Sequence, residues 1–190
     1  MLTPDFLRAK FDAGLAYDDY VASGSDAHAA AWRRFGEGVH LTDGQRSTIG
    51  AFERRLSVLV SSGTWCGDCV QQVPMIDAIA AAAGETIEAR YLDRDEHADL
   101  AERVMLCGGL RVPVVLILNE DFDLLAFEGD RSLARYRAMA AKQLGASCPL
   151  PGAPVPAEEV AATLQDWVDA FERAHLMARL STKLRQRHGD

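Results

Sequence analysis

Long apolar runs, cysteines and positive charge are all scarce in this chain of 190 residues. No apolar stretch approaches the roughly 20 residues that a membrane-spanning helix requires. The first residues also lack the basic and then apolar pattern of a secretory signal. Acidic residues outnumber lysine and arginine by 28 to 20, for a net charge of −8. We therefore expect a cytoplasmic protein that binds neither nucleic acid nor a membrane surface.

The chain has four cysteines, which is too few for a scaffold held together by disulfides. Two of them, Cys66 and Cys69, are separated by Gly67 and Asp68 and preceded by Trp65. Residues three apart are neighbours on a helix, so the two sulfurs can come within disulfide reach.

The segments around the motif strengthen this interpretation. The apolar run 56–60 predicts a buried strand, and apolar residues at helical spacing predict a helix over 67–83. The cysteines thus lie where a strand leads into a helix, and a helix N-terminus stabilises a thiolate. The pattern predicts a redox-active dithiol, with Cys66 as the more acidic and nucleophilic thiol.

A structural zinc site is the alternative for two cysteines at this spacing. Zinc usually takes four cysteine or histidine ligands, but the five histidines are scattered and there is no second pair of cysteines at this spacing. We expect no metal, and no other cofactor, because a dithiol can carry the electrons itself. Cys107 is expected to be a buried thiol on a helix face, and Cys148 an exposed, idle one.

The chain divides into three parts. Residues 1–41 form a helical N-terminal extension that begins at Thr3-Pro4, and 42–147 form an α/β domain that begins with a capping box at Thr42. Residues 148–190 hold a proline-rich connector and a C-terminal helix with a frayed end over 183–188.

Within the α/β domain the patterns predict alternating strands and helices. Ile49, Phe52 and Leu56 are expected to share one face of the helix that opens at Thr42. Strands 56–61 and 87–92 are expected to pair in parallel across the helix between them. The other expected elements are a helix over 98–107, a β-hairpin formed by 112–118 and 122–127, and a helix over 132–144.

This order of elements resembles the thioredoxin superfamily over roughly residues 45–145. The resemblance rests on the motif 65–69, Pro74, Val112-Pro113 before an apolar strand, and Gly129 after the hairpin. The Trp-Cys-Gly-Asp-Cys site, the segment 94–96 and the helical N-terminus are similar to a bacterial branch of that superfamily.

The resemblance implies a thioredoxin-like fold with helical extensions at both ends. It also implies that Cys66 attacks a substrate disulfide, that Cys69 resolves the mixed disulfide, and that Val112-Pro113 is a cis peptide. An extended substrate segment could then pair with the Val112 backbone beside Pro113. Trp65, next to the nucleophile, is expected to face the substrate.

Two departures from the superfamily bear on the chemistry. Its buried acid falls at Val60 and its companion lysine at Ala89, so the usual proton acceptor for Cys69 is absent. Asp68, Asp93 and Asp95 are the alternatives. Asp68 also replaces a proline, and its negative charge should oppose thiolate formation at Cys66. Because the Asp68 charge disfavours the Cys66 thiolate and so the reduced form of the pair, the protein is expected to be a reductant or a mild exchanger and not a strong oxidant.

The sequence as a whole predicts a thiol–disulfide oxidoreductase that reduces protein disulfides and is recycled by a reductase or a small thiol. Two alternatives remain open. One is a binding module on the same fold with little or no redox turnover, which the residues Val60 and Ala89 favour. The other is an enzyme that acts on a small oxidant or thiol.

Overall fold

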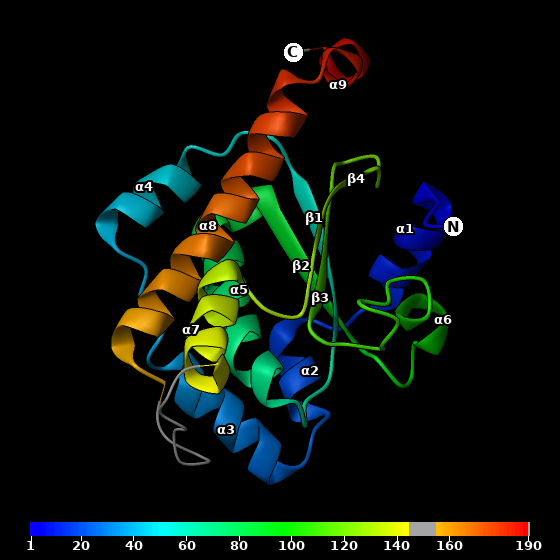
Figure 1. The fold of residues 1–190 in the computed structure, drawn as a ribbon. Helices are drawn as coiled ribbons and strands as arrows, with labels where there is room; N and C mark the ends of the chain where they lie inside the picture. The colour runs from blue at the N-terminus through cyan, green and yellow to red at the C-terminus, as the bar shows by residue number, and fades with distance from the viewer. Residues whose placement is uncertain (145–154, 190) are drawn as a thin grey trace.

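A mixed four-stranded sheet lies at the centre of the computed structural model, which describes residues 1–144 and 155–189. The strand order is β2-β1-β3-β4 (Figure 1). Strands β1 (Leu56–Ser62) and β2 (Ile87–Asp93) run parallel, whereas β3 (Val114–Leu118) is antiparallel to β1 and to β4 (Leu124–Glu128). The predicted βαβ unit, the hairpin and the α/β fold class are confirmed.

Helices cover both faces of this sheet (Figure 1). One face carries the larger group, which is α2 (Tyr17–Ala22), α3 (Asp26–Gly36), α4 (Asp43–Gly50), α5 (Gly67–Ala83) and α8 (Ala157–Leu180), with α7 (Leu133–Leu144) packed beside α8. The opposite face carries α1 (Pro4–Ala13) and α6 (Ala98–Ala101). Within the described residues, no helix is both long and apolar enough to cross a bilayer.

The apolar core has two layers because side chains alternate along each strand. Val58 and Val60 of β1 pack with α5 and with Phe171 of α8. Leu59, between them in sequence, packs on the other side with residues of α1. Both terminal extensions therefore contribute to the core.

Helix ends follow the capping signals of the sequence. Thr3 Oγ1 accepts a hydrogen bond from the Phe6 backbone at 3.3 Å. Thr42 and Gln45 form the complete predicted capping box at the start of α4. Gly84, with φ of +61°, ends α5 in the backbone region that glycine tolerates best.

Two helix predictions ran too far. Helix α4 ends at Gly50, so Phe52 is buried beyond the helix and Leu56 belongs to β1. The helix expected over 98–107 ends at Ala101, and the chain turns back at 106–109. Cys107 lies in that turn with φ of +51° and is exposed, so the prediction of a buried thiol is wrong.

The C-terminal end is more ordered than expected. Residues 182–188 form α9 (Thr182–His188), where Ser181 Oγ accepts a hydrogen bond from Leu184 N and Leu184 is buried. The prediction of a frayed end is therefore wrong. Cys148 and most of the proline-rich connector lie outside the described residues.

Candidate active site

The cysteine pair lies where β1 leads into α5, as the motif predicts. Cys66 is the N-cap of α5 and is half-buried, whereas Cys69 lies one turn inside the helix and is fully buried. Both are free thiols. The accessible sulfur of the pair is thus at the helix N-terminus, and its neighbour is shielded from solvent.

The two thiols have opposite acidities. The Cys69 side chain donates a hydrogen bond to Cys66, and with the backbone N–H groups of Cys69 and Asp68 it lowers the pKa of Cys66 to about 6. Burial raises the pKa of Cys69 well above its ordinary value. At neutral pH this arrangement favours a Cys66 thiolate beside a Cys69 thiol.

The Val112-Pro113 segment lies against the nucleophile. The peptide bond between these residues is cis. The Cys66 sulfur lies 3.7 Å from the Val112 carbonyl oxygen, to which its protonated form donates, so the segment is within reach of a group bonded to that sulfur. The two segments are 46 positions apart in the chain.

A tight turn holds the cysteines to the end of β1. The Cys66 backbone N–H donates to the Gly63 carbonyl oxygen at 3.0 Å. A side chain at Gly63 would place its Cβ 2.7 Å from the Trp65 ring, so any other residue there would displace that ring from its present position. From α3, the buried Trp32 indole N–H donates to the Thr64 carbonyl oxygen at 2.9 Å. The N-terminal extension therefore supports the turn directly.

Trp65 lies on the surface beside the pair and is 47% exposed. The Arg94 guanidinium lies 4.7 Å from the centre of its ring and donates to the Leu110 carbonyl oxygen at 3.0 Å. Arg94 therefore connects Trp65 to the loop that precedes Val112. Leu110 is itself 41% exposed, so an apolar surface extends from Trp65 toward that loop.

Asp68 is paired with two arginines of the segment that follows β4. Its carboxylate contacts Arg131 at 2.5 Å and Arg135 at 3.4 Å. The Asp68 charge still raises the pKa of Cys66, as the sequence suggests, but it is the smallest of the named influences on that pKa. The two arginines carry charge of the opposite sign, so they oppose the effect of the carboxylate on its surroundings.

Of the three aspartates considered as proton acceptors, none has a hydrogen bond to Cys69 among the described residues. Asp68 is paired with arginines, Asp93 accepts the backbone N–H groups of the turn after β2, and Asp95 pairs with Arg94. Val60 and Ala89 pack in the apolar core.

Two hydroxyl groups also act on the cysteine pair. Ser62, at the end of β1, lies close enough to lower the pKa of Cys69, and Tyr20 of α2 faces Ser62 and both cysteines. Sequence analysis missed both residues. No motif marks a buried serine at a strand end, and Tyr20 lies 49 positions from Cys69.

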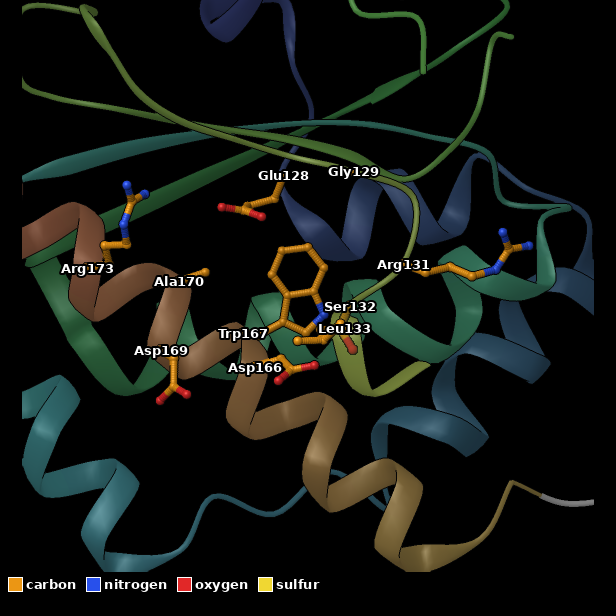
Figure 2. Close-up of a pocket in the computed structure, with 10 residues that line it drawn as sticks. All are labelled: Glu128, Gly129, Arg131, Ser132, Leu133, Asp166, Trp167, Asp169, Ala170 and Arg173. Carbon is orange, nitrogen blue, oxygen red and sulfur yellow. The ribbon is translucent and has the colours of Figure 1, made fainter. Parts of the chain in front are cut away.

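A separate pocket of about 250 Å³ lies between the end of β4, the start of α7 and α8 (Figure 2). The Trp167 ring, Leu133 and Ala170 supply apolar wall, and Glu128 and Arg173 lie at its edge. Arg131 is the one lining residue that also contacts Asp68. The cysteines and Val112-Pro113 do not line this pocket.

Across residues 1–144 and 155–189, no three or more His, Cys, Asp or Glu side chains gather as metal ligands would.

Comparisons with known proteins agree with this geometry. A family model described as thioredoxin matches residues 14–142. A protein of unknown function from Pseudomonas aeruginosa has a similar crystal structure, with a TM-score of 0.64, 23% identity, and coverage of 92% of this chain and 93% of the other. An HIV epitope scaffold aligns with a TM-score of 0.60, 24% identity, and coverage of 88% and 92%. At these identities the two structures support the fold alone. No curated protein matches the sequence.

Proposed function

Because the chain belongs to the thioredoxin family, we propose that it is a thiol–disulfide oxidoreductase that reduces protein disulfides. The observation that carries this proposal is the pairing of a half-exposed Cys66 of lowered pKa with a fully buried Cys69. A structural thiol pair has no need of this difference in acidity and exposure. A nucleophile and its resolving thiol do need it.

The reaction has two exchange steps. The Cys66 thiolate attacks one sulfur of the substrate disulfide, forms a mixed disulfide, and releases the other substrate sulfur as a thiolate. Cys69 then loses its proton and attacks the Cys66 sulfur, which releases the second substrate sulfur. The substrate gains two electrons and the cysteine pair becomes a disulfide. An external reductase or a small thiol must return those electrons.

The surface around Cys66 supports an extended polypeptide as the substrate. The exposed Trp65 ring and Leu110 offer apolar contacts, and Arg94 offers a donor between them. The Val112 carbonyl oxygen can accept a hydrogen bond from a substrate backbone laid along Val112-Pro113. In this proposal Gly67 and Asp68 modulate the nucleophile without touching the substrate. We also propose that the protein belongs to the bacterial branch with a Trp-Cys-Gly-Asp-Cys site. We propose the cytoplasm as its location.

Reduction of insulin by the full chain, with dithiothreitol as electron source, tests the proposal. The wild type should reduce insulin several-fold faster than a Cys66→Ser control. Equal rates for the two would reject redox turnover and favour the binding module. A Cys69→Ser variant should then accumulate mixed disulfides with protein substrates. Mixed disulfides with small thiols alone would favour a small-molecule substrate.

A further inference from the structure

Two buried hydroxyl groups adjoin the resolving cysteine without a hydrogen-bond partner of their own. Ser62 Oγ and Tyr20 Oη are both shielded from solvent, and neither forms a hydrogen bond of good geometry among the described residues, although Ser62 is close enough to Tyr20 and to Cys69 to lower the pKa of each. An unpartnered buried hydroxyl is destabilising because it has lost its hydrogen bonds to water. Such groups in a well-packed core call for an explanation.

The elements that hold these hydroxyls bring them together at Cys69. Ser62 ends β1, and Tyr20 reaches the site from α2 through ring contacts with Trp32 at 5.7 Å and Tyr91 at 5.9 Å. Tyr20, Trp32, Tyr91 and Cys69 belong to one buried cluster. The titratable groups around the hydroxyls are Cys66 and Cys69 of α5, Tyr91 of β2, and Asp93, which pairs in register with Ser62.

Resolution of a mixed disulfide requires a negative charge at this buried position. The Cys69 thiol is a weak acceptor, so it leaves the hydroxyls nearly unsatisfied while it is protonated. Once Cys69 becomes a thiolate, Ser62 gains a charged acceptor, and hydrogen bonds to charged groups are the stronger kind. The arrangement thus favours the state that the second step needs.

We propose that the Ser62 and Tyr20 hydroxyls assist the deprotonation of Cys69 and hold its thiolate during resolution of the mixed disulfide. This rests on the proposed function for its role in turnover. The Cys69 proton passes to water on the side of the half-exposed Cys66, while the Ser62 hydroxyl donates a hydrogen bond to the Cys69 sulfur and the Tyr20 hydroxyl donates one to Ser62 Oγ, so both hydroxyls keep their own hydrogens. The Cys69 sulfur then bonds to Cys66 and displaces the substrate thiolate. Acidities agree with this, since Ser62 lowers the pKa of Cys69 against the effect of burial.

The two exchange steps can be observed separately with dithiobis(nitrobenzoate). Attack by Cys66 releases one thionitrobenzoate, and attack by Cys69 on the resulting mixed disulfide releases a second. A full-length chain with Cys107→Ser and Cys148→Ser restricts the reaction to the pair. Rapid-mixing absorbance between about pH 5 and 9 then yields both rates. The reagent needs only the two cysteines, so the result does not depend on whether proteins are the substrates.

Ser62→Ala and Tyr20→Phe should each slow the second release about tenfold near neutral pH and move its pH profile upward. The first release should stay within about twofold, because Cys66 keeps its own donors. Ser61→Ala and Tyr17→Phe are matched controls. Ser61 points to the opposite face of β1, and the Tyr17 hydroxyl faces Asp77 and Asp18 instead of the cysteines.

Three results would overturn the inference. The first is an unchanged rate of the second release in both Ser62→Ala and Tyr20→Phe. The second is an equal slowing of that release in the matched controls. The third is a similar slowing of both releases, which would indicate a structural role for the hydroxyls. Selective slowing of the second release in the two hydroxyl variants, without insulin reduction by the wild type, would reject the proposed protein substrate and keep the inference. Insulin reduction by the wild type, with no slowing of the second release in Ser62→Ala or Tyr20→Phe, would reject the inference and keep the proposed protein substrate.

Discussion

Cys66 owes its acidity mainly to its partner, and this has a direct consequence for reactivity. The hydrogen bond from Cys69 is the largest influence that lowers the pKa of Cys66 to about 6. Burial raises the pKa of Cys69. Because the thiolate is the nucleophile, Cys66 should become reactive as the pH rises through about 6 and Cys69 should not.

Limited alkylation checks this. With iodoacetamide below one equivalent at neutral pH, Cys66 should carry most of the label within the pair, as measured by peptide mass mapping. Its rate should level off above about pH 7, once the thiolate is fully formed. Preferential labelling of Cys69 would reverse the assigned roles, and a Cys66 rate that still climbs near pH 9 would contradict the lowered pKa of Cys66.

Asp68 and its arginines form the second adjustable feature at the residue scale. Asp68 raises the pKa of Cys66, and Arg131 partly neutralises Asp68. Asp68→Asn should therefore lower the Cys66 pKa, and Arg131→Gln should raise it, each by roughly 0.5–1. The ultraviolet absorbance of the thiolate, followed against pH, gives these values.

A matched control and a double variant sharpen this test. Lys142→Gln removes the same charge from α7, the helix that follows Arg131, but Lys142 pairs with Glu159 instead of Asp68. It should leave the Cys66 pKa nearly unchanged. The double variant Asp68→Asn with Arg131→Gln should resemble Asp68→Asn alone, since the arginine acts through the carboxylate. An additive result would show that Arg131 acts on Cys66 directly.

Apart from α5, which carries the cysteines, α3 has a direct hydrogen bond to the turn before the site. Trp32 of α3 donates its indole N–H to the Thr64 carbonyl oxygen in the turn before the cysteines. Trp167 of α8 is equally buried, but its indole N–H has no partner among the described residues. Replacing each tryptophan by phenylalanine removes similar apolar area, so the difference between the two isolates the hydrogen bond.

Trp32→Phe should therefore lower the free energy of unfolding by about 1 kcal/mol more than Trp167→Phe does, because it also leaves the Thr64 carbonyl unpaired. Urea denaturation of both variants measures this difference. Equal losses would mean that the hydrogen bond adds no net stability.

Local signals explain which elements could be predicted from sequence. The caps at Thr3 and Thr42, and the step from strand to helix at Cys66, depend on neighbours within a few residues, so their patterns are visible in the chain. The apolar spacing of 98–107 fits a longer helix, and it gives no sign of the end at Ala101 or of the reversal at 106–109.

The side chains that complete the site come from distant segments. Arg131 lies 63 positions from Asp68. Ser62 is near Cys69 in sequence, but its role depends on Tyr20, which α2 brings across the sheet face. A chemical motif identifies the reacting atoms, whereas the groups that tune them are set by tertiary packing. This is why the cysteines could be found from sequence and their modulators could not.

At the scale of the whole molecule, α8 connects regions that are far apart in the chain. Near its start, Glu159 pairs with Arg135 of α7, which also contacts Asp68. Near its end, the buried His175 lies at the segment that leads into β1. The C-terminal helix α8 therefore contacts both the segment that leads into β1 and, through Arg135, the start of α5 beside the cysteines.

His175 makes the contact between α8 and the segment before β1 sensitive to acid. Its Nε2 accepts backbone N–H groups from Glu53 at 2.9 Å and Arg54 at 3.2 Å, and its ring stacks on Phe52 at 4.5 Å. Accepting these bonds requires a neutral ring, and burial lowers the pKa of His175 below its ordinary 6.5. The unfolded chain thus binds this proton more readily than the folded one.

The stability that His175 contributes should be fully present above about pH 6.5 and should be lost as the pH falls through its lower folded value. His175→Gln keeps an acceptor oxygen but cannot titrate in this range, so its unfolding free energy should fall less steeply between about pH 7 and 5. Urea denaturation at a series of pH values measures both slopes. Since other groups titrate in both proteins, the difference between the slopes isolates His175. Parallel slopes would mean that the ring keeps its acceptor role without controlling the response to acid.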